Sequence, residues 1–123
     1  MTKKILIVDD IFSNRLLLSS TLESIGIDSE TVENGQIAIK SLQTNDFGMV
    51  LLDIEMPVMN GIETARYIRE EMSDTYSELP IIALTAHNPD EYGTRINEAG
   101  FNEIMSKPYS VEKLGYIIEK YYK

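Results

Sequence analysis

Three runs of apolar residues limit most strongly what this chain can fold into. Each run holds four consecutive apolar residues, with no polar residue between them: Ile5–Val8, Met49–Leu52 and Ile81–Leu84. A strand with one face in water alternates apolar and polar residues, whereas a strand covered on both faces is apolar throughout. Each run is followed by a segment whose apolar residues recur at helical spacing. The sequence therefore predicts buried parallel strands with helices packed against the sheet.

The segments between these runs complete a pattern of five strand–helix units. Residues 27–32 form a weaker, more polar strand that we place at an edge of the sheet, and residues 104–106 form a short last strand. Residues that cap helices or accept a left-handed backbone mark the helix ends. The expected starts are Ser13, Asn34, Asn60, Asn88 and Ser110, and the expected stops include Gly26 and Gly100. With right-handed crossovers, these units form one doubly wound (βα)5 sheet.

Helical spacing also predicts which residues face the sheet. In the first helix the apolar residues at this spacing include Leu16, Leu17 and Leu22. In the third helix Ile62, Ala65, Ile68 and Met72 form the inner stripe, while the opposite face is charged and is expected in water. That face consists of Arg66, Arg69, Glu70 and Glu71.

The composition restricts the partners and the compartment. Among 123 residues, 20 are acidic and 11 are basic, which gives a net charge of −9 and argues against direct binding to nucleic acid or to anionic membranes. The absence of cysteine excludes disulfides and thiolate metal sites. The first apolar run stops at Asp9, too early for a signal peptide or a membrane span. We therefore expect a single cytoplasmic domain over residues 1–123.

Polar residues follow four of the predicted strands at the point where each strand ends. Asp9 and Asp10 follow the first strand, Asp53 the third, Thr85 the fourth and Lys107 the last. In an open parallel sheet the ligand crevice lies outside the carboxyl ends of the strands, so these ends share one rim. We expect the five side chains to converge there.

This set of residues suits phosphoryl chemistry at one aspartate. Neighbouring carboxylates need a cation, and Mg²⁺ accepts a few carboxylate ligands together with water. A bound cation would let Asp53 act as a nucleophile toward an anionic phosphoryl group. Lys107 and the Thr85 hydroxyl would then face phosphoryl oxygens, and the backbone amide of Ala86 could donate a further hydrogen bond.

Four fragments in this order resemble the receiver domain of bacterial two-component response regulators. They are Asp9-Asp10, the stretch from Leu51 to Gly61 around Asp53, Ala83–Ala86, and Lys107-Pro108. The resemblance covers nearly the whole chain. It implies a flavodoxin-like sheet with strand order 2-1-3-4-5.

The resemblance implies that Asp53 accepts a phosphoryl group from a phosphohistidine of a sensor histidine kinase or a histidine phosphotransfer protein. It further implies direct Mg²⁺ coordination by Asp10, Asp53 and the main-chain carbonyl of Glu55, with Asp9 acting through water. The peptide bond between Lys107 and its following proline would be cis. Such a domain is a switch rather than a metabolic enzyme, because it catalyses only its own phosphorylation and dephosphorylation.

The resemblance also implies a surface that reads the phosphorylation state. Members of the family switch through the residue at the position of Thr85 and through an aromatic residue whose position is occupied here by Ile104. Together with Tyr109 and Tyr116, Ile104 is expected to form the surface that binds a downstream output protein or domain.

Two other functions stay open at the level of the sequence. The first is a protein-interaction domain that works without phosphorylation, which the aliphatic residue at Ile104 permits. The second is a small aspartyl-phosphate phosphatase, because Glu55 stands two residues after Asp53, the spacing of a general acid in such enzymes.

Overall fold

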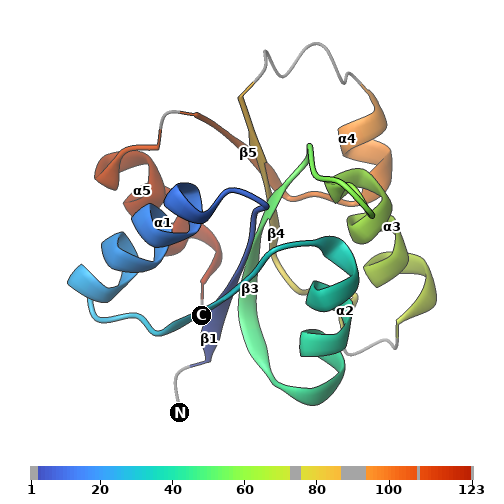
Figure 1. Ribbon diagram of the computed structural model, residues 1–123, viewed down its shortest axis with the longest axis horizontal. Helices are drawn as coiled ribbons and strands as arrows, with labels where there is room; N and C mark the ends of the chain where they lie inside the picture. Colours follow the sequence, from blue (N-terminus) through green and yellow to red (C-terminus); the bar gives the residue numbers. More distant parts are fainter. Residues whose placement is uncertain (1–2, 73–75, 87–93, 108, 123) are drawn as a thin grey trace.

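The computed structural model describes residues 3–72, 76–86, 94–107 and 109–122 (Figure 1). Strands and helices alternate along the chain. The elements are β1 (Lys4–Val8), α1 (Phe12–Ser24), β2 (Ser29–Val32), α2 (Gly35–Thr44), β3 (Phe47–Asp53), α3 (Gly61–Glu71), β4 (Ile81–Thr85), α4 (Thr94–Ala99), β5 (Glu103–Ser106) and α5 (Val111–Tyr121). The five strands are parallel and form one sheet in the order β2-β1-β3-β4-β5. This confirms the predicted doubly wound fold and its strand order.

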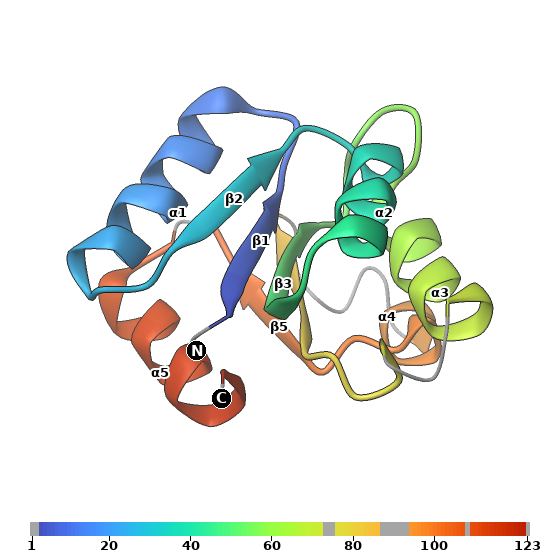
Figure 2. The same ribbon diagram turned by 90° about the horizontal axis from the view of Figure 1, so that it is seen from below.

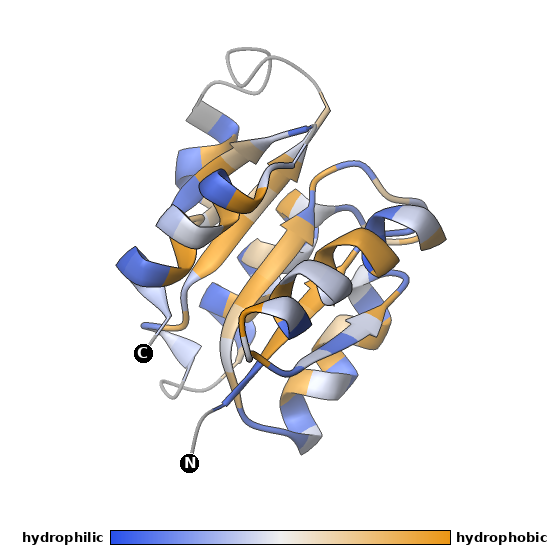
Figure 3. Cartoon of the chain, turned by 90° about the vertical axis from the view of Figure 1, so that its left-hand side faces the viewer, coloured by the Kyte–Doolittle hydropathy of each residue, from blue (hydrophilic) through white to orange (hydrophobic). Residues whose placement is uncertain are grey.

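Helices cover both faces of the sheet (Figure 2). Helices α1 and α5 lie on one face, and α2, α3 and α4 lie on the other. Neighbouring strand residues therefore enter different cores: Leu6 and Val50 pack with α2 and α3, whereas Ile7 and Leu51 pack with α1 and α5. Figure 3 shows the resulting band of apolar strands between the helix layers. Burial on both faces explains why the strand runs do not alternate with polar residues.

Both sheet edges are formed by short strands. β2 lies at one edge, as its polar sequence predicts, and β5 lies at the other. The central strand β3 has seven residues, and all of them except Gly48 are buried. Since β3 lies between β1 and β4, the residue at its carboxyl end has neighbours on both sides.

The start and the buried face of α1 differ from the sequence prediction. Ser13 lies inside the helix, which begins at Phe12 without a side-chain cap. The position of the helix start follows from Asp9, because Asp9 Oδ1 accepts a hydrogen bond from the backbone N–H of Ile11 at 2.9 Å. The helix then buries Leu18 and Leu22 and leaves Leu16 and Leu17 exposed, so the apolar spacing predicted the burial of Leu22 correctly and that of Leu16 and Leu17 wrongly.

Three predicted helix caps are present. Asn34, Asn60 and Ser110 each accept a hydrogen bond from the backbone N–H three residues later. At α3 the bond is reciprocal, because the Glu63 carboxylate accepts from the backbone N–H of Asn60 at 3.1 Å. The predicted cap at Asn88 lies outside the described residues.

Arg69 also departs from its predicted place in water. Its guanidinium donates hydrogen bonds to the carbonyl oxygen of Gly100 at 2.9 and 3.0 Å and to that of Tyr76 at 2.8 Å. It also donates to Asn102 Oδ1 at 2.9 Å, and this oxygen accepts from the backbone N–H of Ile81 at 2.8 Å. Arg69 therefore connects α3 to the segments that precede β4 and β5.

Gly61 allows α3 to begin directly against the end of β3. Its backbone N–H donates to the carbonyl oxygen of Ile54 at 2.9 Å. A Cβ atom at this position would lie 2.3 Å from the carbonyl oxygen of Asp53 and 2.7 Å from the Cα of Ile54, and both are backbone atoms. The turn that follows Asp53 is therefore fixed by a contact that only glycine permits.

We expect Gly61→Ala to lower the free energy of unfolding by about 1–3 kcal/mol, because the new methyl group must displace the backbone of β3. Gly115→Ala in α5 is the matched control. A Cβ there meets nothing within 4 Å, so this variant should gain about 0.5–1 kcal/mol from helix propensity. Urea unfolding followed by circular dichroism measures both values. Equal changes in the two variants would contradict the role of the Gly61 contact.

Candidate functional site

The carboxyl ends of β1, β3, β4 and β5 bring five predicted residues to one rim of the sheet. The carboxylates of Asp9, Asp10 and Asp53 each offer an oxygen within 4.8 Å of the other two. The ammonium of Lys107 lies 3.6 Å from Asp9 Oδ2 and 3.7 Å from Asp53 Oδ2. Thr85 is the last residue of β4 and is fully buried. The rim therefore combines three acids with one cation.

The charges at this rim are poorly solvated. Asp9 and Asp53 are 0% and 3% exposed, while Asp10 faces solvent. Burial, together with the charge of Asp9, raises the pKa of Asp53 from 3.8 to about 7, against the opposing effect of Lys107. One ammonium thus compensates two buried carboxylates incompletely. A further cation at the cluster would favour the ionised form of Asp53.

The backbone around Asp53 orients its carboxylate. The N–H of Glu55 donates to Asp53 Oδ1 at 3.2 Å, and the N–H of Ile54 donates to the carbonyl oxygen of Leu84 at 3.0 Å. In the same turn Val58 adopts a φ of 72°, a left-handed conformation that is costly for a β-branched residue. The turn after β3 is therefore held in one conformation by the surrounding bonds.

Asp9 has an unsatisfied oxygen that fits a hydrated cation. Its Oδ1 accepts from Ile11, but its buried Oδ2 has no hydrogen-bond partner among the described residues. Three carboxylates, one with a buried oxygen that has an ion pair to Lys107 but no hydrogen bond, form the hard oxygen-donor set that Mg²⁺ prefers. The residues present therefore fit a magnesium ion.

Arg15 supports this site, and its role was not predicted from the sequence. Its guanidinium donates to the carbonyl oxygen of Asp9 at 2.7 Å, so α1 helps to fix the end of β1. What the sequence shows is a basic residue in the first turn of the helix that follows the two aspartates. Nothing in its sequence context showed that its partner is a backbone carbonyl.

The end of β5 is aligned with the end of β4. The N–H of Lys107 donates to the carbonyl oxygen of Thr85 at 2.8 Å. This bond places the start of the lysine side chain beside the buried threonine. Ala86 follows at the exposed rim. The expected cis bond involves Pro108, which lies outside the described residues, and it stays a prediction.

The structure divides the three residues that we grouped as a partner surface. Ile104 and Tyr116 line a groove of about 440 Å³ between β5 and α5. Tyr109 instead packs with the core on the side of α1 and α5, and the Lys107 ammonium lies 5.9 Å from the centre of its ring. Tyr109 therefore belongs with the acidic rim rather than with the groove.

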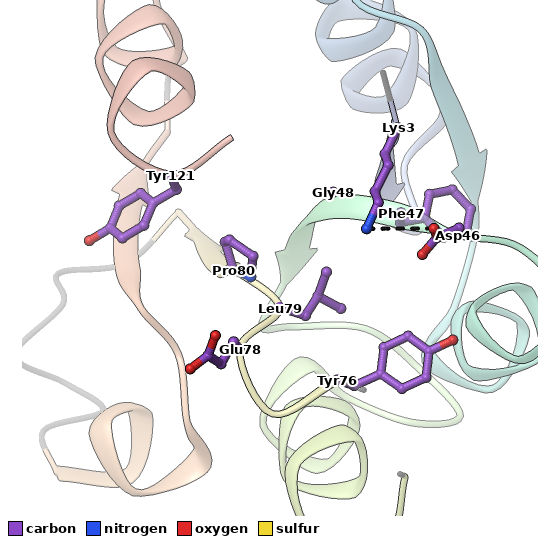
Figure 4. Close-up of a pocket in the computed structure, with 9 residues that line it drawn as sticks. All are labelled: Lys3, Asp46, Phe47, Gly48, Tyr76, Glu78, Leu79, Pro80 and Tyr121. Carbon is purple, nitrogen blue, oxygen red and sulfur yellow. Dashed lines mark ion pairs between the residues drawn. The ribbon is translucent and has the colours of Figure 1, made fainter. Parts of the chain in front are cut away.

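A separate pocket of about 290 Å³ lies at the amino ends of the strands (Figure 4). Four of its polar side chains are engaged with the protein: Lys3 pairs with Asp46 at 3.5 Å, the Tyr76 hydroxyl donates to the carbonyl oxygen of Leu42, and the Tyr121 hydroxyl donates to Glu103. These groups stabilise the end of the sheet where the strands begin. The convergent charges lie at the opposite end.

None of the helices in the described part of the chain is long and apolar enough to cross a membrane.

Comparison with known proteins gives a consistent result. The family model of the response regulator receiver domain matches residues 5–119. The sensor histidine kinase GacS of Pseudomonas protegens is 34% identical over 119 residues, which cover 96% of this chain and 13% of the kinase. The chain therefore spans a small part of the length of this curated relative.

Solved structures show the same fold. The chemotaxis protein CheY4 of Vibrio cholerae superposes with a TM-score of 0.91 at 30% identity, covering 98% of this chain and 99% of that protein. The receiver domain of the sensor histidine kinase PA1611 from Pseudomonas aeruginosa gives a TM-score of 0.88 at 28% identity, and the coverage is 98% of both chains. That domain has a magnesium ion coordinated in its active-site cleft.

We expect Mg²⁺ to stabilise the protein through this cluster. At 100 times its dissociation constant, a ligand that binds only the folded state adds about 2.7 kcal/mol to the free energy of unfolding. Asp10→Asn should remove most of this increment, because it deletes one carboxylate of the cluster. Asp46→Asn, at the other end of the sheet, should keep it. Thermal unfolding with and without Mg²⁺ measures the increment, and an equal gain in all three proteins would exclude binding at this rim.

Proposed function

The chain belongs to the response regulator receiver domain family, and we propose that it accepts a phosphoryl group on Asp53 from a phosphohistidine and thereby changes its binding to a partner. Receiver domains are generally signalling modules rather than enzymes of metabolism. The observation that carries the proposal is the buried Asp53 carboxylate beside two further acids and Lys107. We take residues 1–123 as one receiver unit.

The transfer forms a bond between a carboxylate oxygen of Asp53 and phosphorus, and it breaks the bond between phosphorus and the histidine nitrogen of the donor. Asp53 Oδ1 is engaged by the N–H of Glu55, whereas Oδ2 faces Lys107. The Lys107 ammonium stands where it can compensate the charge of an incoming phosphoryl oxygen. The Thr85 hydroxyl and the backbone amide of Ala86 are the further donors that we assign to the phosphoryl group.

We assign Mg²⁺ to the carboxylates of Asp10 and Asp53 and the main-chain carbonyl of Glu55, with Asp9 acting through water. The support is the compact set of three acids and the buried oxygen of Asp9 that has no hydrogen bond among the described residues. The ion in the cleft of the related PA1611 receiver domain is further support. When bound, the ion neutralises carboxylate charge and phosphoryl charge together.

Exposed apolar side chains around the acidic rim suit a docking partner. Ile11, which follows Asp10, and Phe12 and Leu16 in the first turns of α1 are exposed, and Phe12 is 68% exposed. Such a patch next to a reactive group is typical of a protein-interaction site. The partner that we assign to it is the phosphohistidine-bearing domain of a sensor kinase or of a phosphotransfer protein.

We assign the partner that reads the phosphorylation state to the groove beside β5. Ile104 and the exposed Tyr116 line it. Because β5 is hydrogen-bonded to β4, which ends at Thr85, a change at the threonine can reach this groove through the sheet edge. An output protein or domain would bind there.

Incubation with Mg²⁺ and a small phosphodonor such as acetyl phosphate should add one phosphate to the protein, as read by intact mass spectrometry. Asp53→Asn should abolish the adduct, because the amide nitrogen cannot replace the nucleophilic oxygen. Asp46→Asn serves as the control and should be phosphorylated normally. An undiminished adduct on the Asp53 variant, or no adduct on the native protein, would refute the proposed function.

Phe12→Asp should slow phosphorylation by a phosphohistidine protein by about tenfold or more, since it places a charge in the docking patch. Phosphorylation by acetyl phosphate should be unchanged, because the small donor does not need this surface. Tyr67→Asp, on the outer face of α3, is the matched control and should leave both rates unaffected. A loss with both donors would show that Phe12 acts on the site itself and not on docking.

A further inference from the structure

Tyr109 is an aromatic residue of the acidic rim to which the proposed chemistry assigns no role. It follows β5 and precedes α5, and its ring packs against the core on the side of α1 and α5. The Lys107 ammonium lies 5.9 Å from the ring centre, which is within the range of a cation–π interaction. Tyr109 thus contacts Lys107, which among the described lysines is the one that faces both buried carboxylates.

The position of the Lys107 ammonium needs such a third contact. Its distances to Asp9 and Asp53 are 3.6 and 3.7 Å, longer than a charge-assisted hydrogen bond of about 2.7–2.9 Å. A lysine side chain is a flexible stem with a point charge at its end. The two ion pairs alone therefore do not fix where the charge stands.

The environment strengthens the contact with the ring. The Lys107 side chain is 19% exposed, and cation–π interactions gain strength when the cation is desolvated. Lys120 offers a comparison, since its ammonium lies 5.2 Å from the Tyr121 ring, but its side chain is 48% exposed. The same pair of groups is therefore expected to matter at the rim and to contribute little at the surface.

The hydroxyl of Tyr109 does not explain why a tyrosine occupies this position. It is buried and has no hydrogen-bond partner among the described residues, which costs free energy compared with phenylalanine. Burial and the charges of Asp9 and Asp53 raise its pKa, so the group stays neutral. The ring, rather than a charge on the oxygen, is what Tyr109 presents to Lys107.

We propose that Tyr109 is a positioning residue for phosphoryl transfer, whose ring face holds the Lys107 ammonium between the carboxylates of Asp9 and Asp53. The inference rests on the proposed function, because Lys107 must meet the incoming phosphoryl group. It predicts that loss of the ring slows the transfer without loosening the metal cluster. It also predicts that the effect depends on Lys107.

The test measures two quantities on each folded variant: the initial rate of phosphorylation by acetyl phosphate and the dissociation constant of Mg²⁺. Tyr109→Leu should slow phosphorylation by about tenfold and change Mg²⁺ binding by less than about twofold. Tyr109→Phe keeps the ring and should keep the rate. Tyr121→Leu is the matched control for removal of a tyrosine ring beside a lysine, and it should leave both quantities unchanged.

A double-mutant cycle with Lys107→Met separates positioning from packing. If Tyr109 acts through the ammonium, Tyr109→Leu should cause no further loss of rate when Lys107 is already methionine. Three results would overturn the proposal: an additive loss in that background, a parallel loss of rate and Mg²⁺ binding, or a Phe variant as slow as the Leu variant. Failure of the proposed function looks different, because the native protein would then accept no phosphate at all.

Discussion

Two buried carboxylates share one ammonium at the carboxyl ends of the strands. The rest of the structure holds these two negative charges and one positive charge together. Removing a charge from water is costly unless it is paired, and within the described part of the chain Asp9 and Asp53 form ion pairs with Lys107 alone. The pKa of Asp53 is raised by burial and by the charge of Asp9, and Lys107 opposes this effect only in part. The site thus has a deficit of positive charge that a bound divalent cation would reduce.

The fold can bear this cost because the site lies on rigid elements. β3 is the central strand, so Asp53 is held between the ends of β1 and β4. The turn beyond it is fixed by Gly61 and by backbone bonds to β4, and the start of the Lys107 side chain is fixed by its bond to Thr85. The favourable free energy of apolar burial on both faces of the sheet offsets the cost of burying these charges.

The features that depend on local physics could be predicted from the sequence. Unbroken apolar runs identify strands buried on both faces, and Asn34, Asn60 and Ser110 cap helices through bonds to residues three positions away. The convergence of the strand ends follows from the parallel topology.

Features that depend on distant backbone groups could not be predicted. Arg69 is partly withdrawn from water because its partners include the carbonyl oxygen of Gly100, which is 31 residues away. Tyr109 separates from Ile104 because they pack on opposite faces of the sheet.

The bonds of Arg69 have a mechanical consequence for signalling. They connect the carboxyl end of α4, at Gly100, to α3 and to the segment that precedes β4. The described part of α4 is only six residues long. The end of α4 at Gly100 is therefore pinned, and we expect any displacement of this helix on phosphorylation to be a tilt about Gly100 instead of a slide along the sheet.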